Sequence, residues 1–134
     1  MRARSFLIVG LLVVAPRPAH AQESADREAV RRAALDYIEA FYEGDAAKIR
    51  RSIRPEVTKF GFYRGGSGAT WESEPMSFDE MIAYAERVKS SGRGPRAGAP
   101  KEVMILDVQD QTAAAKVVAW WGTDYLHLAK YDGR

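Results

Sequence analysis

Apolar residues in the first half of the chain recur at helical spacing. From Asp26 to Glu43 they fall three and four positions apart, which predicts an amphipathic helix with one apolar stripe. Gly44 is expected to end this helix, because glycine readily takes the left-handed conformation common at helix C-termini. Asp45 then caps a short second helix that closes at Pro55. The stripe consists of Val30, Ala33, Ala34, Tyr37, Ile38 and Phe41.

The pattern changes to alternation after the second helix. Residues 57–63 predict a strand with Thr58, Phe60 and Phe62 on one face and Lys59 on the other. This alternation places the two phenylalanines together and the lysine opposite them.

A third helix is predicted from Ser77 to about Ser90. Ser77 and Glu80 have the spacing of a capping box, in which each side chain binds a backbone N–H near the other residue. Met76 and Met81 occupy the positions of a hydrophobic staple around this cap.

The rest of the chain predicts strands at residues 101–108, 112–121 and 123–130. Short turns separate them, which favours an antiparallel meander. The predicted fold class is therefore α+β, with N-terminal helices packed on an antiparallel sheet. One domain, residues 22–134, accounts for all these elements.

Both ends of the chain carry signals of their own. Residues 1–21 combine a basic start, a short apolar run and a small-x-small site, and so predict a signal peptide cleaved after Ala21. The protein is then expected to be periplasmic or secreted, without a stable membrane anchor after cleavage. At the other end, Asp132 and Gly133 predict a hairpin turn just before Arg134. We therefore expect that a final strand is missing and that the domain is incomplete at its C-terminus.

Charge and composition narrow the function. The chain has 20 Lys and Arg against 18 Asp and Glu, but three of the arginines lie in the predicted signal peptide. The remaining 17 cations against 18 anions give −1, which argues against nucleic-acid binding. With no cysteine and one histidine outside the predicted signal, His127, neither thiol chemistry nor a metal site is predicted.

Two segments resemble a known family. Residues 34–45 (ALDYIEAFYEGD), and residues 113–119 (AAAKVVA) followed by 123–130 (TDYLHLAK) and an Asp-Gly turn, resemble the putative lumazine-binding family of the nuclear-transport-factor-2-like superfamily. The resemblance implies a curved, cone-shaped sheet whose concave side faces the first helix and leaves an apolar cavity. It also implies a further strand after the turn, which this sequence lacks.

A ligand-binding cavity is the first functional hypothesis, and it requires aromatic lining. The expected ligand is a small apolar or heteroaromatic molecule, with no cofactor and no assigned catalytic residue. The sequence does not decide which face of the strand over residues 123–130 points into the cavity. The face that carries Tyr125 and His127 is slightly favoured as the inward one. The candidate lining residues are Tyr37, Phe41, Phe60, Trp121, Tyr125 and His127.

Two alternatives remain open. The first is a small isomerase or dehydratase, which would need an ionisable group in the cavity; its candidates are Asp36, Tyr37, Asp124, Tyr125 and His127. His127 and Asp124 do not make an acid–base pair, because residues three apart in a strand face opposite ways. The second is a non-catalytic association module, for which Trp120 beside Val118 on the outer sheet face suggests a homodimer contact.

Overall fold

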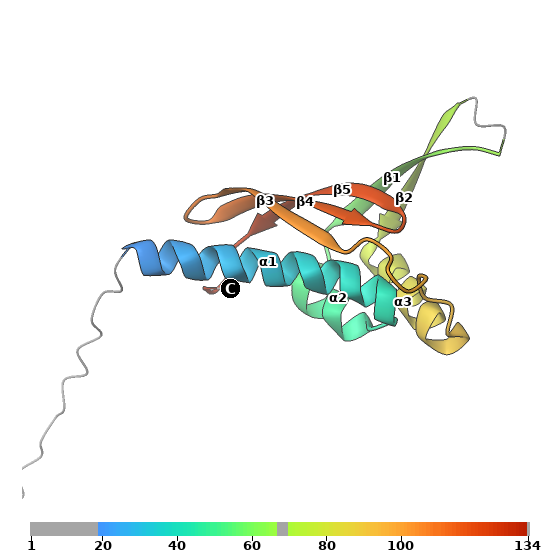
Figure 1. Ribbon diagram of the computed structural model, residues 1–134, viewed down its shortest axis with the longest axis horizontal. Coiled ribbons are helices and arrows are strands. Elements are labelled where there is room, and N and C mark those ends of the chain that lie inside the picture. Colours follow the sequence, from blue (N-terminus) through green and yellow to red (C-terminus); the bar gives the residue numbers. More distant parts are fainter. Residues whose placement is uncertain (1–18, 67–69, 134) are drawn as a thin grey trace, which may run out of the picture.

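A computed structural model of the chain describes residues 19–66 and 70–133. Its helices lie on one side of two antiparallel sheets, so the predicted α+β class is confirmed. The helix α1 runs beneath the strands, and α2 and α3 pack beside its C-terminal half (Figure 1). The elements in chain order are α1 (Ala19–Glu43), α2 (Ala46–Ser52), β1 (Thr58–Arg64), β2 (Trp71–Ser77), α3 (Phe78–Ser91), β3 (Glu102–Val108), β4 (Thr112–Ala119) and β5 (Gly122–Ala129).

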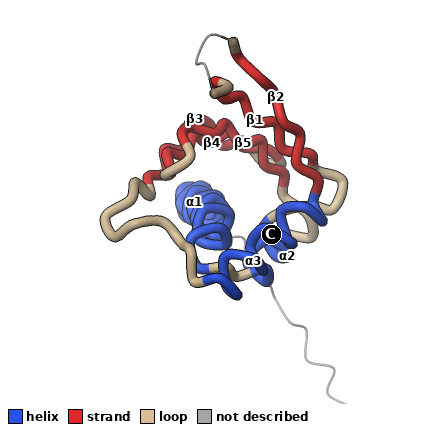
Figure 2. The backbone as a smooth tube through the Cα atoms, turned by 90° about the vertical axis from the view of Figure 1, so that its right-hand side faces the viewer, coloured by secondary structure: helices blue, strands red, loops and turns tan. Residues whose placement is uncertain are grey.

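The predicted meander is confirmed. β3, β4 and β5 form one three-stranded sheet in that order, with antiparallel neighbours. β1 and β2 form a separate hairpin, which extends beyond the body of the molecule (Figures 1 and 2). β2 was not expected from the sequence; Pro75 is tolerated in it because β2 pairs only with β1 and has an open edge.

α1 begins earlier than predicted. The helix already contains Ala19 to Ala21, so the expected cleavage site after Ala21 lies in its first turn. The rest of the predicted signal peptide falls outside the described residues. The C-terminal end of α1 is as predicted: Gly44 has φ of +69°, and a Cβ there would lie 2.4 Å from the backbone nitrogen of Lys89. Glycine is therefore needed both for the turn and for the close approach of α3.

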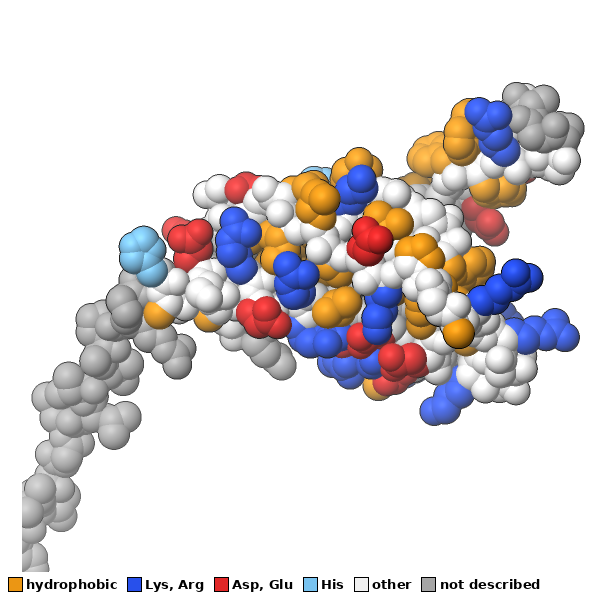
Figure 3. Space-filling view, viewed as in Figure 1, with side chains coloured by type: hydrophobic (Ala, Val, Ile, Leu, Met, Phe, Trp, Pro, Cys, Tyr) orange, Lys and Arg blue, Asp and Glu red, His pale blue; other side chains and the backbone are white. Residues whose placement is uncertain are grey.

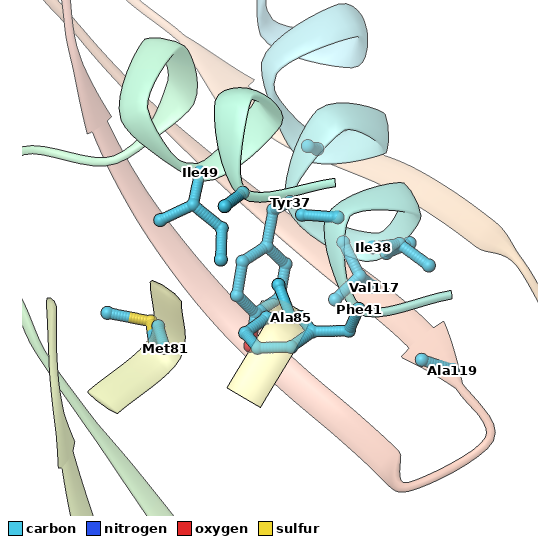
Figure 4. Packing of buried hydrophobic residues seen from close by; sticks show 11 residues of the cluster. Tyr37, Ile38, Phe41, Ile49, Met81, Ala85, Val117 and Ala119 are labelled. Atoms are coloured by element: carbon cyan, nitrogen blue, oxygen red, sulfur yellow. The ribbon is translucent and has the colours of Figure 1, made fainter. Parts of the chain in front are cut away.

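The core forms where the three helices meet the inner face of β4. The helices contribute the apolar stripe of α1 and shorter stripes of α2 and α3, while the alternating residues of β4 close the other side. In Figure 4 the labelled side chains from these four elements point toward one another. The buried apolar residues of this cluster are Ala34, Tyr37, Ile38, Ala40, Phe41, Ala46, Ile49, Met81, Ala85, Val117 and Ala119.

The capping box of α3 is confirmed. The Ser77 hydroxyl accepts a hydrogen bond from the Glu80 backbone N–H at 3.3 Å, and the Glu80 carboxylate accepts one from the Ser77 N–H at 2.8 Å. Replacing Ser77 with alanine removes one of these acceptors. We expect the S77A variant to lose about 1 kcal/mol in the free energy of unfolding, measured by urea denaturation.

S90A provides the matched control for this prediction. Among the residues that the structure describes, the Ser90 hydroxyl donates only to the Arg87 carbonyl oxygen, near the other end of the same helix. The control is expected to change stability by less than about 0.5 kcal/mol. Equal losses in both variants would show that the cap does not stabilise the start of α3.

Candidate functional site

Four polar side chains meet on the inner side of the sheet at one oxygen of Asp124. The Tyr37 hydroxyl and the Lys59 ammonium group each donate a hydrogen bond to Oδ2 of Asp124 at 2.7 Å. The indole N–H of Trp121 donates to the same oxygen, also at 2.7 Å. Lys59 donates in addition to the Tyr37 hydroxyl oxygen at 2.5 Å. We call Tyr37, Lys59, Trp121 and Asp124 the Asp124 cluster.

Four different parts of the chain build the Asp124 cluster. Tyr37 lies on the buried stripe of α1, and Lys59 is the inward residue near the start of β1. Trp121 belongs to the tight turn between β4 and β5, and Asp124 follows it on the inner face of β5. The cluster is therefore the point at which α1 joins the hairpin β1–β2 to the three-stranded sheet.

The rings of Tyr37, Phe41 and Trp121, which we call the aromatic frame, pack around the cluster. The ring of Trp121 meets those of Tyr37 and Phe41 edge to face, at centroid distances of 6.0 and 5.4 Å. The Lys59 ammonium lies 5.1 Å from the Trp121 ring centroid and 5.3 Å from that of Tyr37. Ring faces attract a cation, so the frame adds to the ion pair in fixing Lys59.

The surroundings of Asp124 favour its ionised form. Burial acts to raise the pKa of its carboxyl group, but hydrogen bonds from Lys59, Tyr37 and Trp121 and the charge of Lys59 outweigh that effect. The pKa of Asp124 consequently lies below its ordinary value. Burial and the neighbouring carboxylate raise the pKa of Tyr37, which keeps its proton and remains a donor. At neutral pH the cluster thus holds an ammonium, a carboxylate and a neutral phenol.

One acceptor and one donor of this cluster remain unused. Among the described residues, Oδ1 of Asp124 accepts no hydrogen bond. Every fully buried side-chain nitrogen or oxygen among these residues does have a hydrogen-bond partner. Oδ1 is therefore not fully buried, and the Asp124 side chain as a whole is 18% exposed. Lys59 has three N–H donors and uses two of them inside the cluster. The cluster thus presents an acceptor next to a donor.

A small hollow lies at the other end of the same inner surface. It lies between residues 26–33 of α1, the start of β4 and the end of β5, with a volume of about 90 Å³. Its lining includes an ion pair between Asp26 and Lys130, with an N–O distance of 2.6 Å, and the apolar side chains of Ala33 and Leu128. Pockets for drug-sized ligands are roughly 300–1,000 Å³, so this hollow has room only for a small group.

The structure brings together three of the six predicted lining residues. Tyr37, Phe41 and Trp121 pack against one another, as expected. These rings lie between α1 and the sheet, where the resemblance implied an apolar cavity. Phe60 was expected beside them, and this is wrong: its side chain is 64% exposed, because Lys59 is the residue of β1 that turns inward.

The orientation favoured for β5 is also wrong. Asp124, Leu126 and Leu128 alternate on the partly buried inner face, whereas Tyr125 and His127 are exposed on the outer face. Tyr125 is 68% exposed. Neither residue lies near the aromatic frame, because neighbouring strand residues point to opposite faces of a sheet.

Asp36 belongs to a different group of charges. Its side chain is buried against α2 and accepts two hydrogen bonds from Arg51 at 2.6 Å, with Arg32 3.0 Å away. These contacts hold its pKa below the ordinary value. Asp36 therefore ties α1 to α2. Residues 19–66 and 70–133 contain no group of three His, Cys, Asp or Glu side chains placed to hold a metal ion.

Lys59 is the site residue that the sequence analysis missed. The alternation of residues 57–63 does set Lys59 apart from Thr58, Phe60 and Phe62. The alternation placed Lys59 on the face opposite Phe60 and Phe62, and it gave Lys59 no role in the site. The alternation was the available signal, because one face of a strand with this pattern turns inward; in the structure that face of β1 carries Lys59.

A family model described as putative lumazine-binding matches residues 25–134, and the chain belongs to this family. No curated protein and no solved structure gives a significant match to it. The order of helices and antiparallel strands is consistent with a nuclear-transport-factor-2-like fold. No helix in the described part of the chain is long and apolar enough to cross a membrane.

Proposed function

We propose that this member of the putative lumazine-binding family binds a small heteroaromatic molecule at the Asp124 cluster. The observation that supports the proposal is the unused acceptor of Asp124 beside the remaining donor of Lys59. Because both groups are already fixed by the cluster, a ligand does not have to order them on binding.

The chemistry of this pair favours a ring amide. A ring N–H next to a ring carbonyl presents a donor and an acceptor side by side, which is the complement of Asp124 Oδ1 and the Lys59 ammonium. Lumazine has such an edge in its pyrimidine-dione ring. Hydrogen bonds to charged groups are shorter and stronger than neutral ones, so the pair provides orientation as well as affinity.

The alternative of an isomerase or dehydratase has weaker support. A general base works best when its pKa lies near the operating pH, whereas the contacts of Asp124 lower its pKa. His127, the other candidate, is exposed on the outer face of β5. A binding function needs neither proton transfer nor a cavity group that titrates near neutral pH.

Export and self-association complete the proposal. The basic and apolar start of the sequence and its small-x-small site support export to the periplasm or beyond the cell. A second copy of the chain is the proposed partner of the outer sheet face near Trp120, whose side chain is half-exposed beside Val118.

Titration of the purified chain with lumazine tests ligand binding, with calorimetry as the measurement. We expect D124N to bind at least about tenfold more weakly, because hydrogen bonds to charged groups contribute ~1.5–3 kcal/mol. K59M is expected to weaken binding similarly by removing the donor.

The control variant H127Q changes the outer face of the same strand and should bind as the wild type does. Near-UV circular dichroism shows whether each variant keeps its aromatic packing. No heat of binding for the wild type would overturn lumazine as the ligand. Equal affinities for wild type, D124N and K59M would place the ligand outside the Asp124 cluster.

A further inference from the structure

The hydroxyl of Tyr42 joins three segments at the C-terminal end of α1. The last turn of this helix lies beside the β4–β5 turn and the loop of residues 92–101 (Figure 1). The Tyr42 hydroxyl accepts a hydrogen bond from the Trp120 backbone N–H at 3.0 Å and donates one to the Pro100 carbonyl oxygen. Hydrophobic side chains gather on the surface around this junction (Figure 3). One phenol group therefore ties both the turn and the loop to α1, as donor and as acceptor.

The β4–β5 turn needs an acceptor of this kind. Ala119 and Gly122 are paired in register, so Trp120 and Trp121 are the two central residues of the turn. The hydrogen bond of a four-residue turn joins its first and last residues, which leaves the Trp120 N–H to find another acceptor. Tyr42 supplies that acceptor from a different element and thereby fixes the turn relative to α1.

The same turn carries Trp121 into the Asp124 cluster. The ring of Tyr42 meets that of Trp121 edge to face, at a centroid distance of 6.0 Å. The indole N–H of Trp121 in turn donates to Oδ2 of Asp124 at 2.7 Å. Among the described residues, Tyr42 makes no hydrogen bond to Asp124 itself. An effect of Tyr42 on the carboxylate therefore passes through Trp121.

We infer that Tyr42 is a positioning residue for ligand binding at the Asp124 cluster: its hydroxyl holds the β4–β5 turn where Trp121 keeps its hydrogen bond to Asp124. With Oδ2 held by its donors, the carboxylate presents Oδ1 to the ligand in a fixed direction. The inference rests on the proposed function and deepens it, because it assigns a role to a residue outside the Asp124 cluster.

Hydrogen exchange at the indole N–H of Trp121, followed by NMR in the ligand-free chain, tests the positioning role. Y42F keeps the ring and removes the hydroxyl, so the bonds to Trp120 and Pro100 are both lost. We expect the Trp121 indole N–H to exchange at least about tenfold faster than in the wild type, because the turn then opens locally. The backbone N–H of Val117, in the central strand β4, should keep its wild-type rate.

Y84F is the matched control for this measurement. Tyr84 packs against Phe41 at 5.6 Å, but its hydroxyl makes no hydrogen bond within residues 19–66 and 70–133. This variant should exchange as the wild type does at both positions. An unchanged rate at Trp121 in Y42F would overturn the inference. Equal acceleration at Trp121 and Val117 would overturn it too, because Tyr42 would then stabilise the fold as a whole.

Titration with lumazine tests the consequence for binding. Y42F should bind about three- to tenfold more weakly than the wild type, and Y84F should bind equally well. Equal affinities for the wild type and Y42F would overturn the role of Tyr42 in binding. A wild type that binds no lumazine would overturn the proposed ligand alone, and the exchange rate of Trp121 would still decide whether Tyr42 positions the turn.

Discussion

Replacing Phe41 with alanine is expected to lower the free energy of unfolding by about 3–5 kcal/mol. Phe41 is only 4% exposed, and its ring meets those of Tyr37, Tyr84 and Trp121 edge to face at 5.4 to 5.6 Å. The substitution removes these contacts and leaves a cavity between α1, α3 and the β4–β5 turn. Urea denaturation followed by far-UV circular dichroism measures the loss.

The F62A variant is the matched control for Phe41. Phe62 has the same side chain but is 69% exposed on β1, away from the aromatic frame. Its replacement should change the free energy of unfolding by no more than about 0.5 kcal/mol. If F41A and F62A were equally mild, the aromatic rings around Phe41 would not be a tightly packed core.

The features that the sequence predicted correctly depend on neighbouring residues. The stripe of α1 that includes Tyr37 and Phe41, the capping box of Ser77 and Glu80, and the meander of β3 to β5 follow from spacing within one element or one turn. Periodicity, capping and short turns are local physics, so a single sequence contains them.

The features that escaped prediction depend on contacts across the chain. Lys59 and Asp124 are 65 positions apart in the sequence. No local pattern indicates that Lys59 and Tyr37 donate to the same oxygen of Asp124. β2 was missed because its sequence, WESEPMS, contains two Glu and a Pro, which strands use less often. Its pairing with β1 is what makes it a strand.

The orientation of β5 shows why burial cannot always be inferred from alternation. Tyr125 and Ala129 make one face as apolar as Leu126 and Leu128 make the other. The choice is made by partners outside the strand: Tyr37, Lys59 and Trp121 bind Asp124 and turn the leucines inward with it. Turning β5 over would break the three hydrogen bonds to the carboxylate of Asp124. This would cost more free energy than leaving Tyr125 exposed does.

Replacing Glu39 with glutamine is expected to lower the free energy of unfolding at pH 7 by about 2 kcal/mol. The Glu39 carboxylate, 13% exposed, contacts Lys48 at 2.7 Å, Arg32 at 2.7 Å and Lys101 at 3.1 Å. Burial acts to raise the pKa of Glu39, but hydrogen bonds from Lys48 and Lys101 and the charges of Lys48 and Arg32 lower it to about 2. The expected loss is moderated because Arg32 and Lys101 are themselves exposed to solvent, which screens their charges.

The same substitution should change how stability depends on pH. Folding lowers the pKa of Glu39 from 4.5 to about 2, so its stabilising contribution is complete above pH 4.5 and is lost as the pH falls through about 2. The difference between wild type and E39Q, measured by urea denaturation at each pH, should therefore shrink over that interval.

E43Q is the control for this pH series, because Glu43 also contacts Lys48, at 2.6 Å, but is 51% exposed. Its loss at pH 7 should be below about 0.5 kcal/mol. A constant gap between wild type and E39Q from pH 7 to pH 2 would mean that the shape of the Glu39 side chain, rather than its charge, joins α1 to α2 and to the start of β3. If the stability difference between wild type and E39Q instead disappears as the pH falls, the charge of the Glu39 carboxylate joins these elements through its ion pairs with Arg32, Lys48 and Lys101.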